Sequence, residues 1–159
     1  MHPLRLLALS LAVLAPTLRA QAPDLASPLP ADSTVLSGRL PNGLRYLIRR
    51  NTKPEKRAEL RLVVNTGSIL EDDAQRGLAH FVEHMAFNGT RRFPRSSIVD
   101  FIERVGMRFG ADLNAYTSFD ETVYMLQVPT DTSELVSTAL DVLEDWAHDV
   151  SFDGAELKK

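Results

Sequence analysis

The segment His80-Phe81-Val82-Glu83-His84 constrains this chain more than any other part, because its spacing is useful only on a helix. At about 100° per residue, His80 and His84 lie one turn apart on the same side of such a helix, with Glu83 beside them. The other side carries apolar residues that we expect to face a protein core, namely Phe81, Val82 and Met85. The motif therefore predicts a helix with one buried face and one polar face directed into a cleft.

Two imidazoles at this spacing can hold one Zn²⁺ from a single rigid element. Zinc with three protein ligands keeps a fourth position for water and lowers the pKa of that water toward roughly 7. A nearby carboxylate that is not a ligand can take the water's proton and pass it to a leaving amine, which makes Glu83 the candidate general base. Two surface histidines on an amphipathic helix are the alternative, although the pattern arises by chance in only about half a percent of such chains.

The remaining histidines and the absence of cysteine limit where else chemistry could occur. Without cysteine, a metal site must use His, Asp or Glu, and there is no cysteine nucleophile. His148 stands beside Asp145 and Asp149 on what we expect to be the polar side of a helix, so it is interpreted as solvated. The chain also lacks a Gly-x-Ser-x-Gly motif and a phosphate-binding glycine loop. Its net charge of −3 shows no basic excess, so no nucleic-acid partner is expected.

Residues 1–20 have the layout of a secretory signal peptide: Arg5, an apolar run over residues 6–15, Pro16 and a small residue at Ala20. We expect cleavage after Ala20, which removes two arginines and gives a mature charge of −3 − 2 = −5. The protein is then exported, periplasmic or secreted, with no stable membrane span after removal of the signal. A buried N-terminal helix is the alternative.

The remainder alternates between strand and helix patterns. Residues 21–35 read as a proline-rich linker, and ordered structure is expected from near Val35. Strands are predicted over residues 44–49, 58–65, 113–118 and 122–128. Helices are predicted from an Asp73 cap to Phe87, from Ser96 or Ser97 to Gly106, and over residues 132–150. This order favours an α+β fold, with a mixed, largely antiparallel sheet and helices packed on one face.

The stretch from Gly77 to Thr90, together with Gly67, resembles the zinc-site signature of the pitrilysin–insulysin–mitochondrial processing peptidase family. Flanking pieces are also similar to that family: Asn42-Gly43-Leu44, residues 114–118, Thr122 and Tyr124. The resemblance covers roughly residues 36–159, and only the zinc-site stretch is highly specific.

The resemblance implies a processing-peptidase-like metallohydrolase, an endopeptidase of peptides or unfolded segments, with one zinc ion per site. His80 and His84 would be zinc ligands and Glu83 the general base. Asn114 and Ala115 match residues of an edge strand to which a substrate backbone adds; a plain edge strand is the alternative. Further homologous domains or subunits would complete a chamber around the peptide substrate. A non-catalytic binding or scaffold homologue is the competing interpretation.

The family pattern places the third zinc ligand, a glutamate, roughly 75 to 85 residues beyond the second histidine. That window runs beyond Lys159, and neither Glu144 nor Glu156 is well placed by this count. We therefore expect residues 36–159 to be the N-terminal part of an incomplete catalytic domain, and the chain alone to be inactive.

Overall fold

The computed structural model describes residue 28 and residues 30–154, and the chain divides into two compact units, Met1–Arg50 and Asn51–Lys159. The predicted signal peptide, most of the predicted linker and Glu156 lie outside the described residues. In the first unit, β1 (Val35–Arg39) pairs antiparallel with β2 (Arg45–Arg49). The first strand among the described residues begins at Val35, and it was not predicted as a strand.

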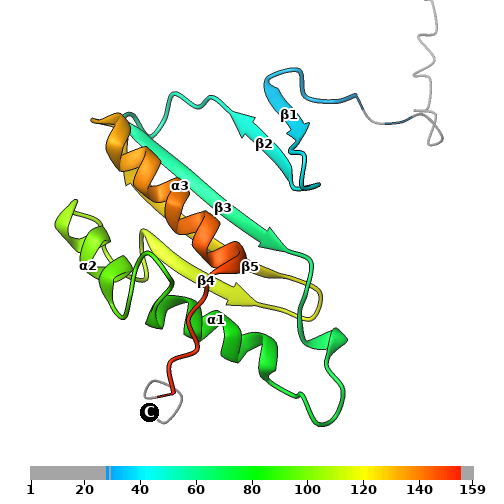
Figure 1. Cartoon of the computed structure of the whole chain (residues 1–159). Coiled ribbons are helices and arrows are strands. Elements are labelled where there is room, and N and C mark those ends of the chain that lie inside the picture. The colour runs from blue at the N-terminus through cyan, green and yellow to red at the C-terminus, as the bar shows by residue number, and fades with distance from the viewer. Residues whose placement is uncertain (1–27, 29, 155–159) are drawn as a thin grey trace, which may run out of the picture. The chain divides into compact units, whose positions relative to one another are not determined.

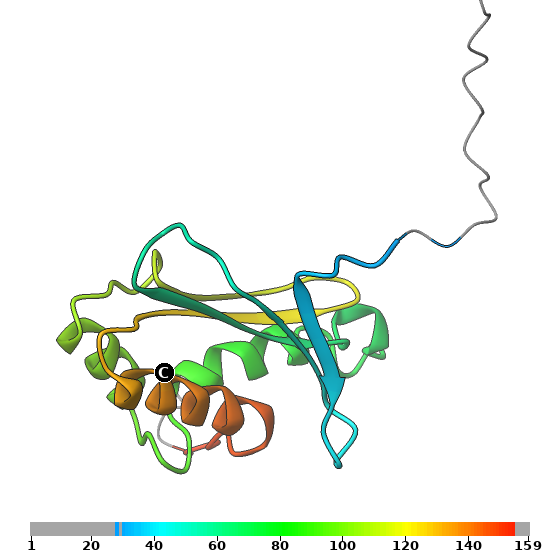
Figure 2. The ribbon, with the colours of Figure 1, turned by 90° about the horizontal axis from the view of Figure 1, so that it is seen from above.

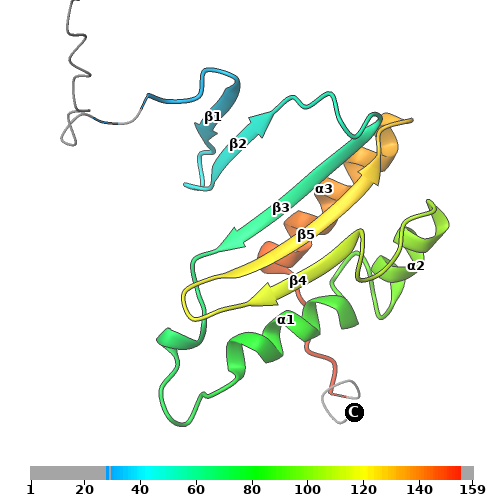
Figure 3. The same cartoon turned by 180° about the vertical axis from the view of Figure 1, so that it is seen from behind.

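The second unit is built on a three-stranded antiparallel sheet in the order β3-β5-β4 (Figure 1). Its strands are β3 (Arg57–Val64), β4 (Leu113–Thr117) and β5 (Thr122–Pro129). Seen from behind, β4 is the edge strand beside α1 (Leu78–Asn88), as Figure 3 shows. The predicted strands at 113–118 and 122–128 are therefore confirmed as a hairpin.

The three helices that the structure describes in this unit cover the same face of the sheet (Figure 2). They are α1, α2 (Ser97–Arg104) and α3 (Ser133–His148), with a short 3₁₀ turn, η1 (Ser68–Leu70), before α1. Helix α3 contacts β3 and β5, whereas α1 contacts mainly β4. The expected α+β class with helices on one face is confirmed, and within the described residues no helix has the length and apolar character needed to cross a bilayer.

The core lies between the sheet and the helices, and β3 shows how the sequence builds it. Its residues alternate between half-buried and exposed along the whole strand, as a strand with one covered face requires. The fully buried apolar side chains come from all three helices and from β4 and β5; they include Ala86, Ile98, Ile102, Leu113, Leu126, Val128, Ala139 and Val142.

Helix α1 begins four residues later than predicted, because Gly77 has a φ of +88° and cannot lie inside a right-handed helix. Asp73 does not cap it and instead contacts Arg76. The predicted ends hold elsewhere: Gly89 follows α1, and the Thr132 hydroxyl accepts a hydrogen bond from the Leu135 amide at 3.4 Å at the start of α3.

Candidate active site

His80 and His84 project from the exposed side of α1 and converge. Their Nε2 atoms lie 3.0 Å apart and their ring centroids 4.6 Å apart. Both residues are exposed, as the predicted polar face requires. The Phe81 side chain, expected in the core, is 38% exposed instead, while Met85 is buried as predicted.

The two imidazoles fit a zinc ion. Tetrahedral zinc with nitrogens at 2.0–2.1 Å separates two such nitrogens by about 3.3 Å, a few tenths of an ångström from the observed spacing. No third ligand joins them in the part of the chain that the structure describes, where no cluster of three or more His, Cys, Asp or Glu side chains could hold a metal ion. Glu144 is engaged elsewhere, because its carboxylate accepts a hydrogen bond from Arg92 at 2.6 Å.

Glu83 lies at the boundary between the histidine face and the core, rather than on the open polar face. It is only 8% exposed. Its Oε2 accepts a hydrogen bond from the Thr117 hydroxyl at 2.7 Å, so the end of β4 is attached to the middle of α1. Thr117 belongs to the family-like stretch 114–118, but no role was predicted for it.

Tyr124 of β5 is buried and lies close enough to this carboxylate to be affected by its charge. Burial, and then the nearby negative charge of Glu83, raise the pKa of Tyr124 to about 12, so the phenol stays neutral at physiological pH. The ring stacks on Trp146 of α3, with centroids 5.2 Å apart.

The N-terminal end of α1 is capped by Glu71, which the sequence reading missed because no helical spacing connects it to the motif. Its carboxylate accepts hydrogen bonds from the Gly77 amide at 2.7 Å and the Ala79 amide at 2.8 Å. The bonds from Ala79 and then Gly77 lower the pKa of Glu71, because they favour the charged form. An acceptor at this position satisfies amides that a helix start leaves unpaired.

The C-terminal end of α1 is clamped to α3. The Trp146 indole donates to the Ala86 carbonyl at 3.1 Å. Asp145, expected on the polar side of its helix, is fully buried instead. Its carboxylate accepts three bonds from the segment after α1: from the Thr90 hydroxyl at 2.7 Å, the Arg92 amide at 2.9 Å and the Arg92 Nε at 2.6 Å.

His148 takes no part in the histidine pair. It is about half exposed at the end of α3, where Nδ1 lies 3.0 Å from Asp149. Its predicted solvated position is confirmed.

Asn114 and Ala115 lie on β4, an edge strand of the three-stranded sheet, which is the position that the resemblance implies for them. The Asp112 carbonyl accepts a hydrogen bond from the Gln127 amide, and the Ser118 amide donates to the Glu121 carbonyl. Hydrogen-bonded residues alternate in an antiparallel pair, so Asn114 and Tyr116 also bond to β5. By that alternation, Ala115 presents its amide to the open edge, where the Asn114 Oδ1 accepts from it at 2.9 Å.

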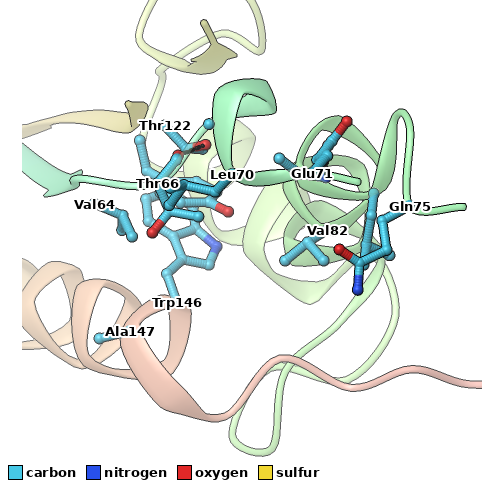
Figure 4. A pocket seen from close by; sticks show the side chains of 13 residues that line it. Val64, Thr66, Leu70, Glu71, Gln75, Val82, Thr122, Trp146 and Ala147 are labelled. Carbon is cyan, nitrogen blue, oxygen red and sulfur yellow. Dashed lines mark hydrogen bonds between the residues drawn. The ribbon is translucent and has the colours of Figure 1, made fainter. Parts of the chain in front are cut away.

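A separate pocket of about 340 Å³ opens beside α1 (Figure 4). Its lining combines α1 with the loop after β3 and the end of α3, and includes Val64, Leu70, Val82, Trp146 and Ala147. Neither histidine of the pair nor Glu83 lines it. This pocket therefore does not coincide with the candidate chemistry.

Comparison with known proteins assigns this arrangement to a family. The model of the insulinase family, peptidase family M16, matches residues 46–159. A probable zinc protease PqqL of Haemophilus influenzae is 44% identical over 124 residues, which cover 78% of this chain and 13% of the relative.

Solved structures agree. The first half of the periplasmic protease PqqL from Escherichia coli superposes with a TM-score of 0.78 at 41% identity, over 82% of this chain and 28% of that one. Pitrilysin superposes with a TM-score of 0.66 at 27% identity, over 78% of this chain and 12% of that one. The chain thus spans about an eighth of the length of these full-size relatives. Together with the geometry of α1, these matches show that the chain belongs to the insulinase family of peptidases.

Proposed function

We propose that the full-length protein is a zinc-dependent endopeptidase that hydrolyses peptides or unfolded segments. One observation carries the proposal: two imidazole nitrogens converge to 3.0 Å on the open side of α1, with the Glu83 carboxylate held on the same helix. Membership in a peptidase family and similarity to proteins named zinc proteases support it.

In this proposal His80 and His84 hold zinc, and a glutamate beyond Lys159 supplies the third ligand. A zinc ion held there would act as a Lewis acid that polarises a peptide carbonyl and eases the deprotonation of water. The exposed histidine face leaves room for both metal and substrate to approach.

Glu83 acts as the general base. It accepts a proton from the attacking water as the water oxygen bonds to the carbonyl carbon, and it gives that proton to the amine as the C–N bond breaks. The substrate backbone adds to the outer edge of β4 near Asn114 and Ala115, where it replaces the Asn114 side chain at the Ala115 amide. Backbone hydrogen bonds at a strand edge do not demand a particular sequence. Since Thr117 ends β4 and contacts Glu83, a peptide on this edge would lead toward the base.

The test separates metal binding from proton transfer. Glu83→Gln keeps the side-chain shape but removes the base, so zinc content should persist while peptide hydrolysis falls by roughly 10² or more. His80→Ala should lose the metal itself. His148→Ala is the matched control, since it removes a histidine outside the pair and should change neither quantity. Zinc content is measured by elemental analysis and hydrolysis with an internally quenched fluorescent peptide.

A non-catalytic binding homologue is the second candidate, and the same proteins distinguish it. Wild type that bound zinc yet cleaved no peptide would support the non-catalytic candidate. Near-normal turnover in Glu83→Gln would instead show that Glu83 is not the base.

We also propose that the protein is exported and that further domains or subunits complete the enzyme. The pattern of residues 1–20 supports export, as does the relative described as a periplasmic protease. The small fraction of each relative that this chain covers supports the additional domains.

A further inference from the structure

We propose that Thr117 is a positioning residue for the base: its hydroxyl holds one oxygen of Glu83, so that the other oxygen is the one that exchanges protons with water. This inference rests on the proposed function and deepens it, because it concerns how the base is oriented.

The contact itself has a fixed direction. The Thr117 hydroxyl donates its single proton to Glu83 Oε2 across the 2.7 Å contact. A bond to a charged acceptor is stronger than one between neutral groups. Oε2 is thereby engaged, and Oε1 is left for a proton transfer.

The hydroxyl is held by the sheet rather than by a loop. Thr117 is the last residue of β4 and stands opposite Thr122, the first residue of β5. Thr122 is buried and its hydroxyl donates to the Thr66 carbonyl at 2.9 Å, with the Thr117 oxygen at 3.4 Å. The Thr122 hydroxyl therefore connects the end of β4 with Thr66, which follows β3.

The orientation matters because Glu83 is nearly buried. A glutamate carboxylate can turn its two oxygens in several directions, and only one of these directions lets an oxygen take a proton from the attacking water. A donor on a rigid strand restricts that rotation before the substrate arrives, as a supporting group on a regular element does. Loss of the hydroxyl should therefore lower turnover without weakening substrate or metal binding.

The main test compares Thr117→Val with Thr117→Ser in the full-length protein. Valine keeps the β-branched shape and removes the donor, so we expect kcat to fall roughly 10-fold or more, with KM and zinc content unchanged. Serine keeps the donor, and kcat should stay within about threefold of wild type. In a Glu83→Gln background, Thr117→Val should have no further effect.

A second readout needs neither substrate nor metal. In zinc-free protein labelled with ¹³C at glutamate carboxyl groups, Thr117→Val should shift the Glu83 resonance, which Glu83→Gln assigns by its disappearance. If valine prevents folding, Thr117→Ala removes the same hydroxyl with a smaller side chain.

Two outcomes would overturn the inference while leaving the proposed function intact. One is unchanged kcat in Thr117→Val when Glu83→Gln is inactive; the other is an equal loss in the serine and valine variants, which would indicate a packing role. Activity in Glu83→Gln would instead reject the proposed function itself.

Discussion

The two ends of helix α1 are held in different ways. At the N-terminal end, Glu71 caps the helix from a loop only six to eight residues away along the chain, and its contacts lie partly in solvent. At the C-terminal end, Asp145 and Trp146 reach in from α3, between 53 and 60 residues away, and both are buried. One end thus depends on local contacts and the other on tertiary structure.

This difference indicates which end sets the position of the histidines. Buried, charge-assisted bonds are not screened by salt as exposed ones are, and breaking them leaves polar groups without partners. The clamp at α3 therefore fixes the helix in the fold, while the Glu71 cap prevents fraying of the turn that carries His80. Three changes test this division, from the largest expected effect to the smallest.

Asp145→Asn should break the C-terminal end. An amide has one acceptor oxygen where the carboxylate has two, so it cannot accept all three bonds from Thr90 and Arg92. We expect a local loss of about 2–3 kcal/mol. Amide hydrogen exchange over residues 84–92 should then rise roughly 30- to 150-fold.

Asp141→Asn is the matched control for that experiment. It makes the same chemical change one helical turn earlier, on a carboxylate that is 46% exposed and also pairs with Arg92. Exposed pairs contribute little, so exchange should rise less than about fivefold. Equal effects of the two variants would show that the buried carboxylate is not what holds the helix.

Acid should weaken the same end without any mutation. Burial alone would raise the pKa of Asp145, but the hydrogen bonds from Thr90 and Arg92 outweigh it and hold the pKa below 3.8. Because the folded-state pKa is depressed, the stabilisation is fully present above pH 3.8 and is lost as the pH falls through the lower value. Protection of these amides in zinc-free protein, taken relative to the intrinsic exchange rate at each pH, should therefore stay constant down to that pH and then fall, whereas Asp145→Asn should show no such step. A step near neutral pH would assign the release to another group.

Glu71→Gln should have the smallest effect, confined to the N-terminal end. One amide oxygen replaces two carboxylate oxygens that serve Gly77 and Ala79 separately. We expect a few-fold rise in exchange at those two amides and none over residues 84–92. In wild type, high salt should also raise exchange at the same two amides, because it screens the exposed carboxylate. Asp73→Asn is the control, because Asp73 is highly exposed and contacts only Arg76 among the described residues. If the control matched Glu71→Gln, the cap would lie where the sequence suggested.

The sequence predicted the elements of the second unit well, because its strands and helices have clear periodicity. The histidine pair followed from spacing on one helix, which local geometry alone determines. The start of α1 did not, since Asp73 and Glu71 are equally plausible caps until the turn at Gly77 is known.

The residues that support the site were harder to infer. Asp145 looks like a surface residue of an amphipathic helix, and only the fold brings Thr90 and Arg92 against it. Thr117 meets Glu83 across 34 positions of sequence, and no local pattern encodes that contact. Tertiary proximity, rather than residue type, gives these side chains their roles.

The open edge of β4 also bears on how such a protein avoids aggregation. An exposed strand edge can pair with the edge of another molecule, and natural sheets limit this by keeping such strands short or by occupying their polar groups. β4 has five residues, the Leu113 carbonyl accepts from the Gly110 amide, and the Ala115 amide is occupied by its neighbour's side chain. A second copy of the strand would have to displace both internal partners together, whereas a short flexible peptide can displace them one at a time. The Asn114 side chain, which lies where a substrate backbone is proposed to bind, thus also makes pairing between two copies of β4 less favourable.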